Sequence, residues 1–183
     1  MLLIPPAGPR PALALVLIAL AGCTPDAPAP PAAPAARDTA QAAPIPAEAV
    51  VGQTVYVPVY SHIFHQDGSR ELDLTVTLSI RNTDPGRTLT VADVGYYDSA
   101  GRRVRRYGEG PFRLGPLASE AFVVEQRDRT GGVGANFLVV WHAEAELSPP
   151  IIEAVMISTA QAQGISLVSR GEVVRTLGGD RAP

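Results

Sequence analysis

The chain contains no lysine, so all of its positive charge comes from arginine. This absence excludes a phosphate-binding P-loop, whose motif requires Lys followed by Ser or Thr, and it excludes Ser-Lys and Schiff-base catalysis. The 15 basic and 18 acidic residues give a formal net charge of −3. Because nucleic-acid-binding domains are strongly basic, we do not expect a nucleic-acid partner.

Cysteine and long hydrophobic runs are also scarce. The only cysteine is Cys23, so no intramolecular disulfide is available and the fold must rest on the burial of apolar side chains. The apolar run Ala12 to Ala21 has roughly half of the about 20 residues that a transmembrane helix needs. No Gly-x-Ser-x-Gly nucleophile motif occurs. The sequence therefore predicts a non-catalytic protein without a cofactor.

The N-terminal region has the organisation of a secretion signal. Arg10 precedes the apolar run, which ends in Leu20-Ala21-Gly22-Cys23. This tetrad resembles a bacterial lipobox, which implies that residues 1–22 are a signal peptide and that Cys23 receives a diacylglyceryl group and an N-acyl chain such as palmitate. Two or more acyl chains anchor a protein stably in a membrane. The alternative is an ordinary cleaved signal with an incidental cysteine.

The lipobox interpretation also predicts where the protein lies. Thr24 rather than Asp follows the cysteine, which favours the outer membrane in a Gram-negative cell, with the protein facing the periplasm. Residues 23–51 are rich in Pro and Ala and are typical of a semi-rigid spacer. We expect one folded domain at residues 52–177 and a disordered tail at residues 178–183.

The folded part is predicted to be all-β. Apolar and polar residues alternate without interruption from Leu72 to Ile80, the pattern of a half-buried strand. The other expected strands are Val55 to Phe64, Thr88 to Tyr97, Arg102 to Tyr107, Ala121 to Glu125, Asn136 to Ala145, Ile151 to Thr159 and Ile165 to Val174. Short strands at this spacing favour an immunoglobulin-like antiparallel β-sandwich of about seven to nine strands.

Two strands carry positional signals. Pro58 predicts an edge position or a bulge, because proline donates no backbone hydrogen bond. Arg102 to Tyr107 is expected to be an edge strand guarded by charge, with Arg102 and Arg106 on one face and Arg103 and Arg105 on the other. The alternative is an arginine patch for anionic lipid headgroups or cell-wall polymers.

Three histidines form the sharpest chemical hypothesis. Imidazole is a common ligand of Zn, Cu and Ni, so His62, His65 and His142 are an alternative metal site. Residues three apart on a strand face opposite sides, so His62 and His65 share a metal only if the strand is bulged or turns between them. Histidines without a metal are the simpler interpretation.

Two polar, glycine-containing loops are the candidate partner-binding regions. They are Ser61 to Arg70 and Arg127 to Asn136, which flank the best-defined strands. Gly131 to Gly134 resembles a phosphate-binding loop only superficially, because a strand rather than a helix follows it. The partner expected at these loops is an envelope protein or a cell-wall component.

Six segments spread over residues 52–174 carry a family resemblance. They read VYVPVYSHIFH, LTVTLSIRNTDP, VGYYDSAGRRVRRY, GGVGANFLVVWHA, PPIIEAVMI and GISLVSRG. Together they resemble the bacterial domain-of-unknown-function family 3124. The resemblance implies a small secreted or lipoprotein-like bacterial protein, and it supplies no catalytic residue.

Overall fold

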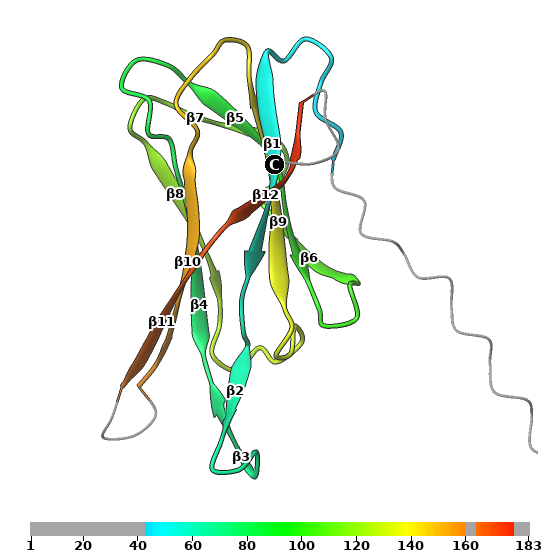
Figure 1. Ribbon diagram of the computed structural model, residues 1–183, viewed down its shortest axis with the longest axis vertical. Coiled ribbons are helices and arrows are strands. Elements are labelled where there is room, and N and C mark those ends of the chain that lie inside the picture. Colours follow the sequence, from blue (N-terminus) through cyan, green and yellow to red (C-terminus); the bar gives the residue numbers. More distant parts are fainter. Residues whose placement is uncertain (1–42, 160–163, 178–183) are drawn as a thin grey trace, which may run out of the picture. The chain divides into compact units, whose positions relative to one another are not determined.

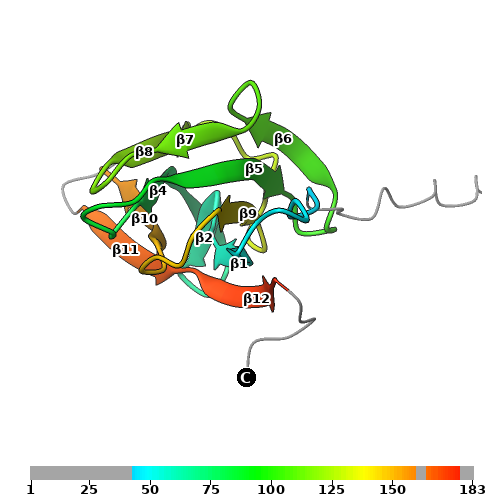
Figure 2. The ribbon, with the colours of Figure 1, turned by 90° about the horizontal axis from the view of Figure 1, so that it is seen from above.

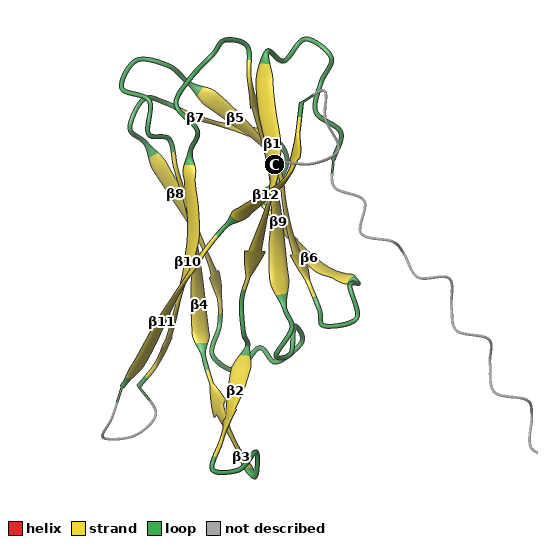
Figure 3. Cartoon of the chain, viewed as in Figure 1, coloured by secondary structure: helices red, strands yellow, loops and turns green. Residues whose placement is uncertain are grey.

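The structure, a computed structural model, describes residues 43–159 and 164–177 (Figure 1). Every regular element in these residues is a strand, and they contain no helix that could span a membrane (Figure 3). The twelve strands are β1 (Val51–Pro58), β2 (His62–His65), β3 (Arg70–Asp73), β4 (Thr75–Arg81), β5 (Leu89–Tyr97), β6 (Arg103–Tyr107), β7 (Phe112–Leu114), β8 (Ser119–Val124), β9 (Asn136–Ala143), β10 (Ile151–Ser158), β11 (Ile165–Arg170) and β12 (Glu172–Thr176).

The strands form two facing sheets and one small hairpin, and neighbouring strands are antiparallel. The six-stranded sheet has the order β12-β1-β9-β5-β6, with β7 also paired to β5. The four-stranded sheet has the order β11-β10-β4-β8, and β2 pairs only with β3. Seen from above, β8, β4, β10 and β11 lie on one side and β5, β9 and β1 on the other (Figure 2). This arrangement confirms the predicted antiparallel β-sandwich.

The core lies between the two sheets. Val76, Leu78 and Ile80 of β4 are fully buried, whereas the intervening Thr and Ser residues are half-buried on the outer face, as the alternation predicted. Trp141 and Phe137 of β9 complete the same core from the opposite sheet. Each fully buried apolar side chain of this kind stabilises the fold by about 1.5–3 kcal/mol. Burial of this kind is therefore the source of stability in a domain without disulfides.

The strand count exceeds the predicted seven to nine, because three expected strands are each divided in two. Residues 55–64 contribute to β1 and β2, residues 72–80 to β3 and β4, and residues 165–174 to β11 and β12; β7 was not expected. The division between β11 and β12 falls at Gly171, where the chain crosses between the sheets. A Cβ there would lie 2.5 Å from Val55 Cγ1 and 2.9 Å from Ile152 O, so only glycine fits without displacement.

Pro58 lies at a local edge, as its missing N–H predicted. It pairs with Asn136 of β9 on one side, while the pairing of β1 with β12 ends at Tyr56, opposite Glu172. No neighbouring strand in the described residues therefore needs a hydrogen bond from position 58.

The described domain begins before residue 52. Val51 is already in β1, Ala49 is buried, and the Val50 N–H donates to Ala143 O at 2.9 Å. The last residues of the predicted spacer thus pair with the six-stranded sheet. The signal peptide, Cys23, the rest of the spacer and the tail at 178–183 lie outside the described residues.

Candidate functional site

The two predicted partner-binding loops meet at one end of the sandwich, which we call the hairpin end because the β2–β3 hairpin projects from it (Figure 1). The Ser61 N–H donates to Gly132 O at 3.1 Å, and the Val59 N–H donates to Ala135 O at 2.9 Å. The Leu74 N–H, after β3, donates back to Ser61 O at 2.9 Å. Ser61 and Gly132 are 71 residues apart in the sequence, so two distant segments form one surface.

Arg129 ties the second loop to the hairpin. Its guanidinium group binds Glu71 Oε2 through Nη1 at 2.5 Å and Asp73 Oδ1 through Nε at 2.6 Å. The hydrogen bonds to Asp73 and then to Glu71 raise the pKa of Arg129. A guanidinium held by two carboxylates has a fixed direction, so the loop position follows that of β3.

The same loop packs on the core through Gly131. A Cβ at this position would collide with the hydroxyl of Tyr96 and would lie 2.6 Å from Ala135 Cβ. The Tyr96 hydroxyl is buried and has no hydrogen-bond partner among the described residues. Burial, followed by the negative charge of Asp128, raises the pKa of Tyr96 to about 12. The loop therefore rests directly on a neutral phenol.

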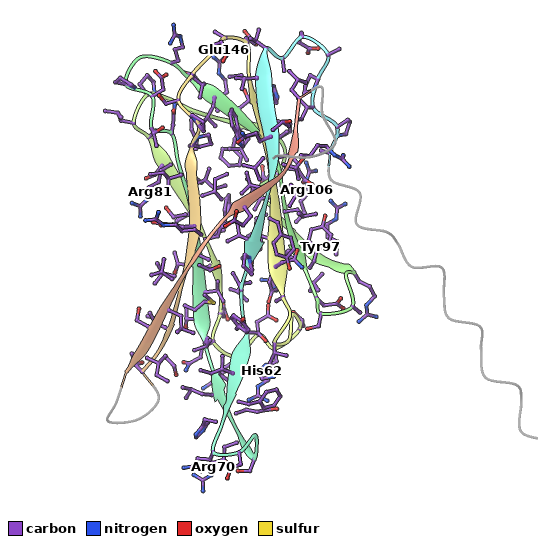
Figure 4. The ribbon with its side chains drawn as sticks, in the orientation of Figure 1. His62, Arg70, Arg81, Tyr97, Arg106 and Glu146 are labelled. Atoms are coloured by element: carbon purple, nitrogen blue, oxygen red, sulfur yellow. The ribbon has the colours of Figure 1, made fainter. Side chains whose placement is uncertain are left out.

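Aromatic side chains remain exposed on this fixed support. Phe64 of β2 is 54% exposed and Tyr60, just before β2, is 41% exposed. The His62 ring packs edge-on against Phe64, with 5.7 Å between centroids, and Figure 4 shows His62 at the hairpin end. Sequence alternation could not identify these exposed rings, because β2 pairs only with β3 and is not a strand of either larger sheet.

The three histidines of the alternative metal site are not brought together. His62 and His65 lie at opposite ends of β2, paired with Asp73 and Arg70. His142 is near the far end of β9, opposite Gly52 and Thr90. Among residues 43–159 and 164–177, no three His, Cys, Asp or Glu side chains are grouped so that they could hold a metal ion.

A Ser-His-Glu arrangement occurs at the hairpin end. Ser61 Oγ lies 3.1 Å from His62 Nδ1, and His62 Nε2 lies 3.9 Å from Glu71 Oε1. Ser61, however, is fully buried, and its hydroxyl donates to Gly132 O at 3.2 Å. A nucleophile must reach its substrate, so this geometry favours a structural role that joins the two loops.

The arginines of β6 are used within the fold. β6 is an edge strand, as predicted, but the face assignment was wrong: Arg106 Nε binds Asp93 Oδ1 at 2.7 Å and Arg103 Nη1 binds Asp93 Oδ2 at 3.3 Å. The register of β5 and β6 shifts between Tyr96 and Tyr97, so an extra residue in β6 brings both arginines to one face. Figure 4 shows Arg106 and Tyr97 on the side of the six-stranded sheet away from the other sheet.

The neighbouring arginines also have carboxylate partners. Arg102 binds Asp98 at 2.7 Å, and Arg105 binds Asp128 at 2.8 Å. Burial raises the pKa of Asp98, but the hydrogen bonds from the backbone and side chain of Arg102 outweigh it and the net pKa is lowered. The four arginines between positions 102 and 106 therefore each have a carboxylate partner.

The loop at Gly131 to Gly134 connects two strands, as expected. It lies between β8 and β9 and contains neither helix nor strand. Asp93, in contrast, was missed by sequence reasoning. The available signal was a carboxylate inside an otherwise apolar strand, where all residues except Thr90 are buried.

Comparisons with known proteins give a family and one distant structural likeness. No curated protein matches the chain. A solved structure from Thermotoga maritima, described as "Crystal Structure of Thermotoga maritima 1070", is 10% identical and covers 66% of this chain and 92% of its own, with a TM-score of 0.41. We draw nothing further from so distant a likeness. The family described as "Protein of unknown function (DUF3124)" matches residues 52–174, so the chain belongs to this family.

Proposed function

We propose that this protein is a lipid-anchored protein of the bacterial cell envelope whose sandwich domain binds another envelope component, without catalysis, through its hairpin end. The binding surface consists of Tyr60, His62, Phe64, Glu71 and Arg129. The anchor is the lipidated Cys23, and the Pro/Ala-rich spacer separates it from the domain.

The exposed ring of Phe64 on a fixed support is the observation that carries this proposal. An aromatic side chain that is 54% exposed on a hairpin tied down by Arg129 is costly to leave in water and loses little freedom on binding. Aromatic residues and arginine dominate the energetic centres of protein interfaces. The charged pair of Arg129 and Glu71 beside it is typical of the polar rim that surrounds such centres.

A capture experiment tests the surface. Wild-type protein and the variant Phe64→Ala are crosslinked in envelope fractions, and the partners recovered are compared. Val168→Ala is the matched control, because Val168 is 64% exposed but lies on β11 of the four-stranded sheet. Loss of a partner with Phe64→Ala alone supports the proposal; equal recovery from all three proteins contradicts it.

The anchor is tested separately. Metabolic labelling with palmitate should mark the wild-type protein and leave Cys23→Ser unlabelled, and the variant should leave the membrane fraction. An unlabelled wild-type protein would favour the ordinary cleaved signal instead. This result is independent of the surface experiment, because Cys23 and Phe64 belong to different parts of the chain.

A further inference from the structure

A hollow of about 270 Å³ lies at the end of the six-stranded sheet opposite the hairpin. We call this end the β7 end, because β7, the start of β5 and the finish of β9 lie there (Figure 1). The hollow is lined by Arg87, Thr88, Thr90, Arg113, Ala143, Glu144 and Ala145. It is separate from the surface proposed above, and none of its residues belongs to the loops that sequence analysis selected.

Strand pairing places the polar side chains of the hollow side by side. Thr90 of β5 is directly opposite Arg113 of β7 and, on its other flank, directly opposite His142 of β9. Directly opposed residues in antiparallel strands have Cβ atoms about 4.5–5.5 Å apart on one face. The Nδ1 atom of His142 is buried without a hydrogen-bond partner among the described residues. His142 does not line the hollow, whereas Thr90 and Arg113 line it from adjacent strands.

The guanidinium group of Arg113 has no partner in the part of the chain that the structure describes. Among residues 43–159 and 164–177, Arg113 has no ion pair and no side-chain hydrogen bond, although seven of the described arginines have ion pairs. An arginine carries five N–H donors in a planar fork suited to phosphate and carboxylate. No described residue occupies any of these five donors of Arg113.

Arg87 is only weakly engaged. Its Nη1 lies 3.9 Å from Asp84 Oδ2, beyond hydrogen-bond distance, and its side chain is 59% exposed. Asp84 directs its oxygens at backbone donors instead: the N–H groups of Gly86, Arg87 and Ser148 lie 2.9, 2.8 and 3.2 Å away. The Gly86 hydrogen bond is the largest cause of the lowered pKa of Asp84. The carboxylate nearest to Arg87 is thus already occupied.

Asn82 holds the two arginine-bearing segments in place. It is 2% exposed, and its Nδ2 lies 2.7 Å from Arg87 O, 3.1 Å from Leu114 O and 2.9 Å from Gly115 O. One buried amide therefore fixes the backbone beside both Arg87 and Arg113. The backbone part of the ordering cost is therefore already met, whereas the two guanidinium groups still lose rotamer freedom when they bind an anion.

We propose that this hollow, the Arg87–Arg113 site, binds a phosphate group. Two guanidinium groups supply charge and paired donors, and the hydroxyls of Thr88 and Thr90 supply further hydrogen bonds. Glu144, the one acid in the lining, leaves the site with two cations against one anion. This balance suits a phosphate whose other substituent is neutral or positively charged.

The chemistry is shared by two sources of phosphate. One is a free small phosphorylated molecule, and the other is the headgroup of a phospholipid. The hollow measures about 270 Å³, many times the about 10–15 Å³ that a cavity needs to hold a single water. There is room for the group to which the phosphate is attached, in either source.

Titration of the full chain with defined phosphate probes tests the proposal. Cys23→Ser is present in every protein so that no acyl chain enters the assay. The probes are inorganic phosphate, O-phosphoethanolamine, and vesicles of phosphatidylethanolamine with phosphatidylglycerol. The variants are Arg87→Gln, Arg113→Gln, both together, and Thr90→Val, which keeps the shape and charge but removes a hydroxyl. Arg170→Gln is the control, because Arg170 is exposed, lies on β11 of the other sheet and has no ion pair with any described residue.

Each single arginine variant should weaken binding of inorganic phosphate about tenfold or more, and the double variant should abolish it. Thr90→Val should weaken binding several-fold without a change of charge, and Arg170→Gln should bind as the parent protein does. Vesicle binding that falls in the double variant identifies a lipid headgroup as the source. Soluble-probe binding that falls in the double variant, with vesicle binding unchanged, identifies a free ligand. Either result supports the site.

Three results would overturn the site: no probe binds the parent protein, the double variant binds like the parent, or Arg170→Gln loses as much affinity as Arg113→Gln. The last result would mean non-specific attraction by surface charge. Near-ultraviolet circular dichroism of each variant verifies that the sandwich is intact, so a loss of binding is assigned to the site itself.

Discussion

The two ends of the sandwich use the same residue type in opposite ways. At the hairpin end, Arg129 is held by Glu71 and Asp73 and joins two loops. At the β7 end, Arg113 has no ion pair among the described residues, although it stands in a hollow with a second arginine. An arginine with two carboxylate partners stabilises structure, whereas one without a partner retains its donors for a ligand.

The two ends also differ in their exposed apolar surface. The hairpin end exposes Phe64 and Tyr60, while the hollow at the β7 end is lined by charged residues, threonines and alanines. Large exposed rings suit a macromolecular partner, and a small polar hollow suits a small anion. The domain therefore has two surfaces with separate chemistry on one rigid scaffold.

The largest expected effect concerns a glycine at each end. Gly131→Ala should lower the free energy of unfolding by about 3 kcal/mol, because the new methyl group collides with the Tyr96 hydroxyl and with Ala135. Gly115→Ala, after β7, should change it by less than about 0.5 kcal/mol, because nothing lies within 4 Å of the new Cβ. Urea denaturation measures both.

The double variant Gly131→Ala with Tyr96→Phe provides the control for that collision. Removing the hydroxyl should restore part of the lost stability. An equal loss with and without the hydroxyl would mean that the loop does not rest on Tyr96.

The next effect compares a carboxylate that binds two arginines, Asp93, with a carboxylate of the hollow, Glu144. Asp93→Asn should cost about 2 kcal/mol, because Asp93 is 3% exposed and both Arg103 and Arg106 lose their ionised partner. Glu144→Gln at the β7 end should change stability by less than about 0.5 kcal/mol. Thermal unfolding at neutral pH measures the stability of both variants. Comparable losses of stability would contradict the distinction between a carboxylate with arginine partners and one without them.

A smaller effect separates the two arginines. Arg129→Gln should loosen the hairpin, speeding amide hydrogen exchange at Ser61 and Leu74, whose N–H groups donate within the hairpin end. The effect should shrink in high salt, because these ion pairs are exposed and screened. Arg113→Gln should leave exchange throughout the sandwich unchanged. Faster exchange with Arg113→Gln would show that Arg113 has a structural partner after all.

The smallest effect at neutral pH is expected from Tyr96→Phe. The pKa of Tyr96 rises from 10.0 to about 12 in the folded protein, so its contribution to stability is complete below pH 10 and is lost as the pH approaches 12. Wild type should therefore lose stability across that interval, and Tyr96→Phe should lose less. Tyr97 and Tyr107, whose pKa values are also raised by burial, account for what remains. Identical alkaline profiles would place the Tyr96 phenol in contact with water.

Period-two alternation predicts a strand when one face of that strand is buried, whereas β5 is buried on both faces. β4 is the clearest example of alternation, with Val76, Leu78 and Ile80 inward. Alternation could not show where a strand is divided, because Gly171 and the residues around Leu74 continue the same pattern while the backbone changes partner. The short β7 lacks enough residues for a pattern to appear.

The loops chosen from the sequence at Ser61 to Arg70 and Arg127 to Asn136 do come together, although nothing in their composition specified that they would touch. Their contact depends on Arg129 and on the packing of Gly131 against Tyr96, which are long-range features. The β7 end was not predicted for the same reason. Arg87, Thr90 and Arg113 are separated in sequence and meet only through the register of β5 with β7 and the hydrogen bonds of Asn82.

The amino-acid sequence by itself determined the all-β class and the strands of the core, because these depend on local composition and periodicity. The family resemblance came from six longer sequence segments. The tertiary structure alone decided which arginines are neutralised, since ion pairs depend on distances across strands. A one-residue shift between β5 and β6 brought Arg103 and Arg106 together on Asp93. Pairing of β7 with β5 left Arg113 beside Thr90, without a carboxylate partner in the described part of the chain.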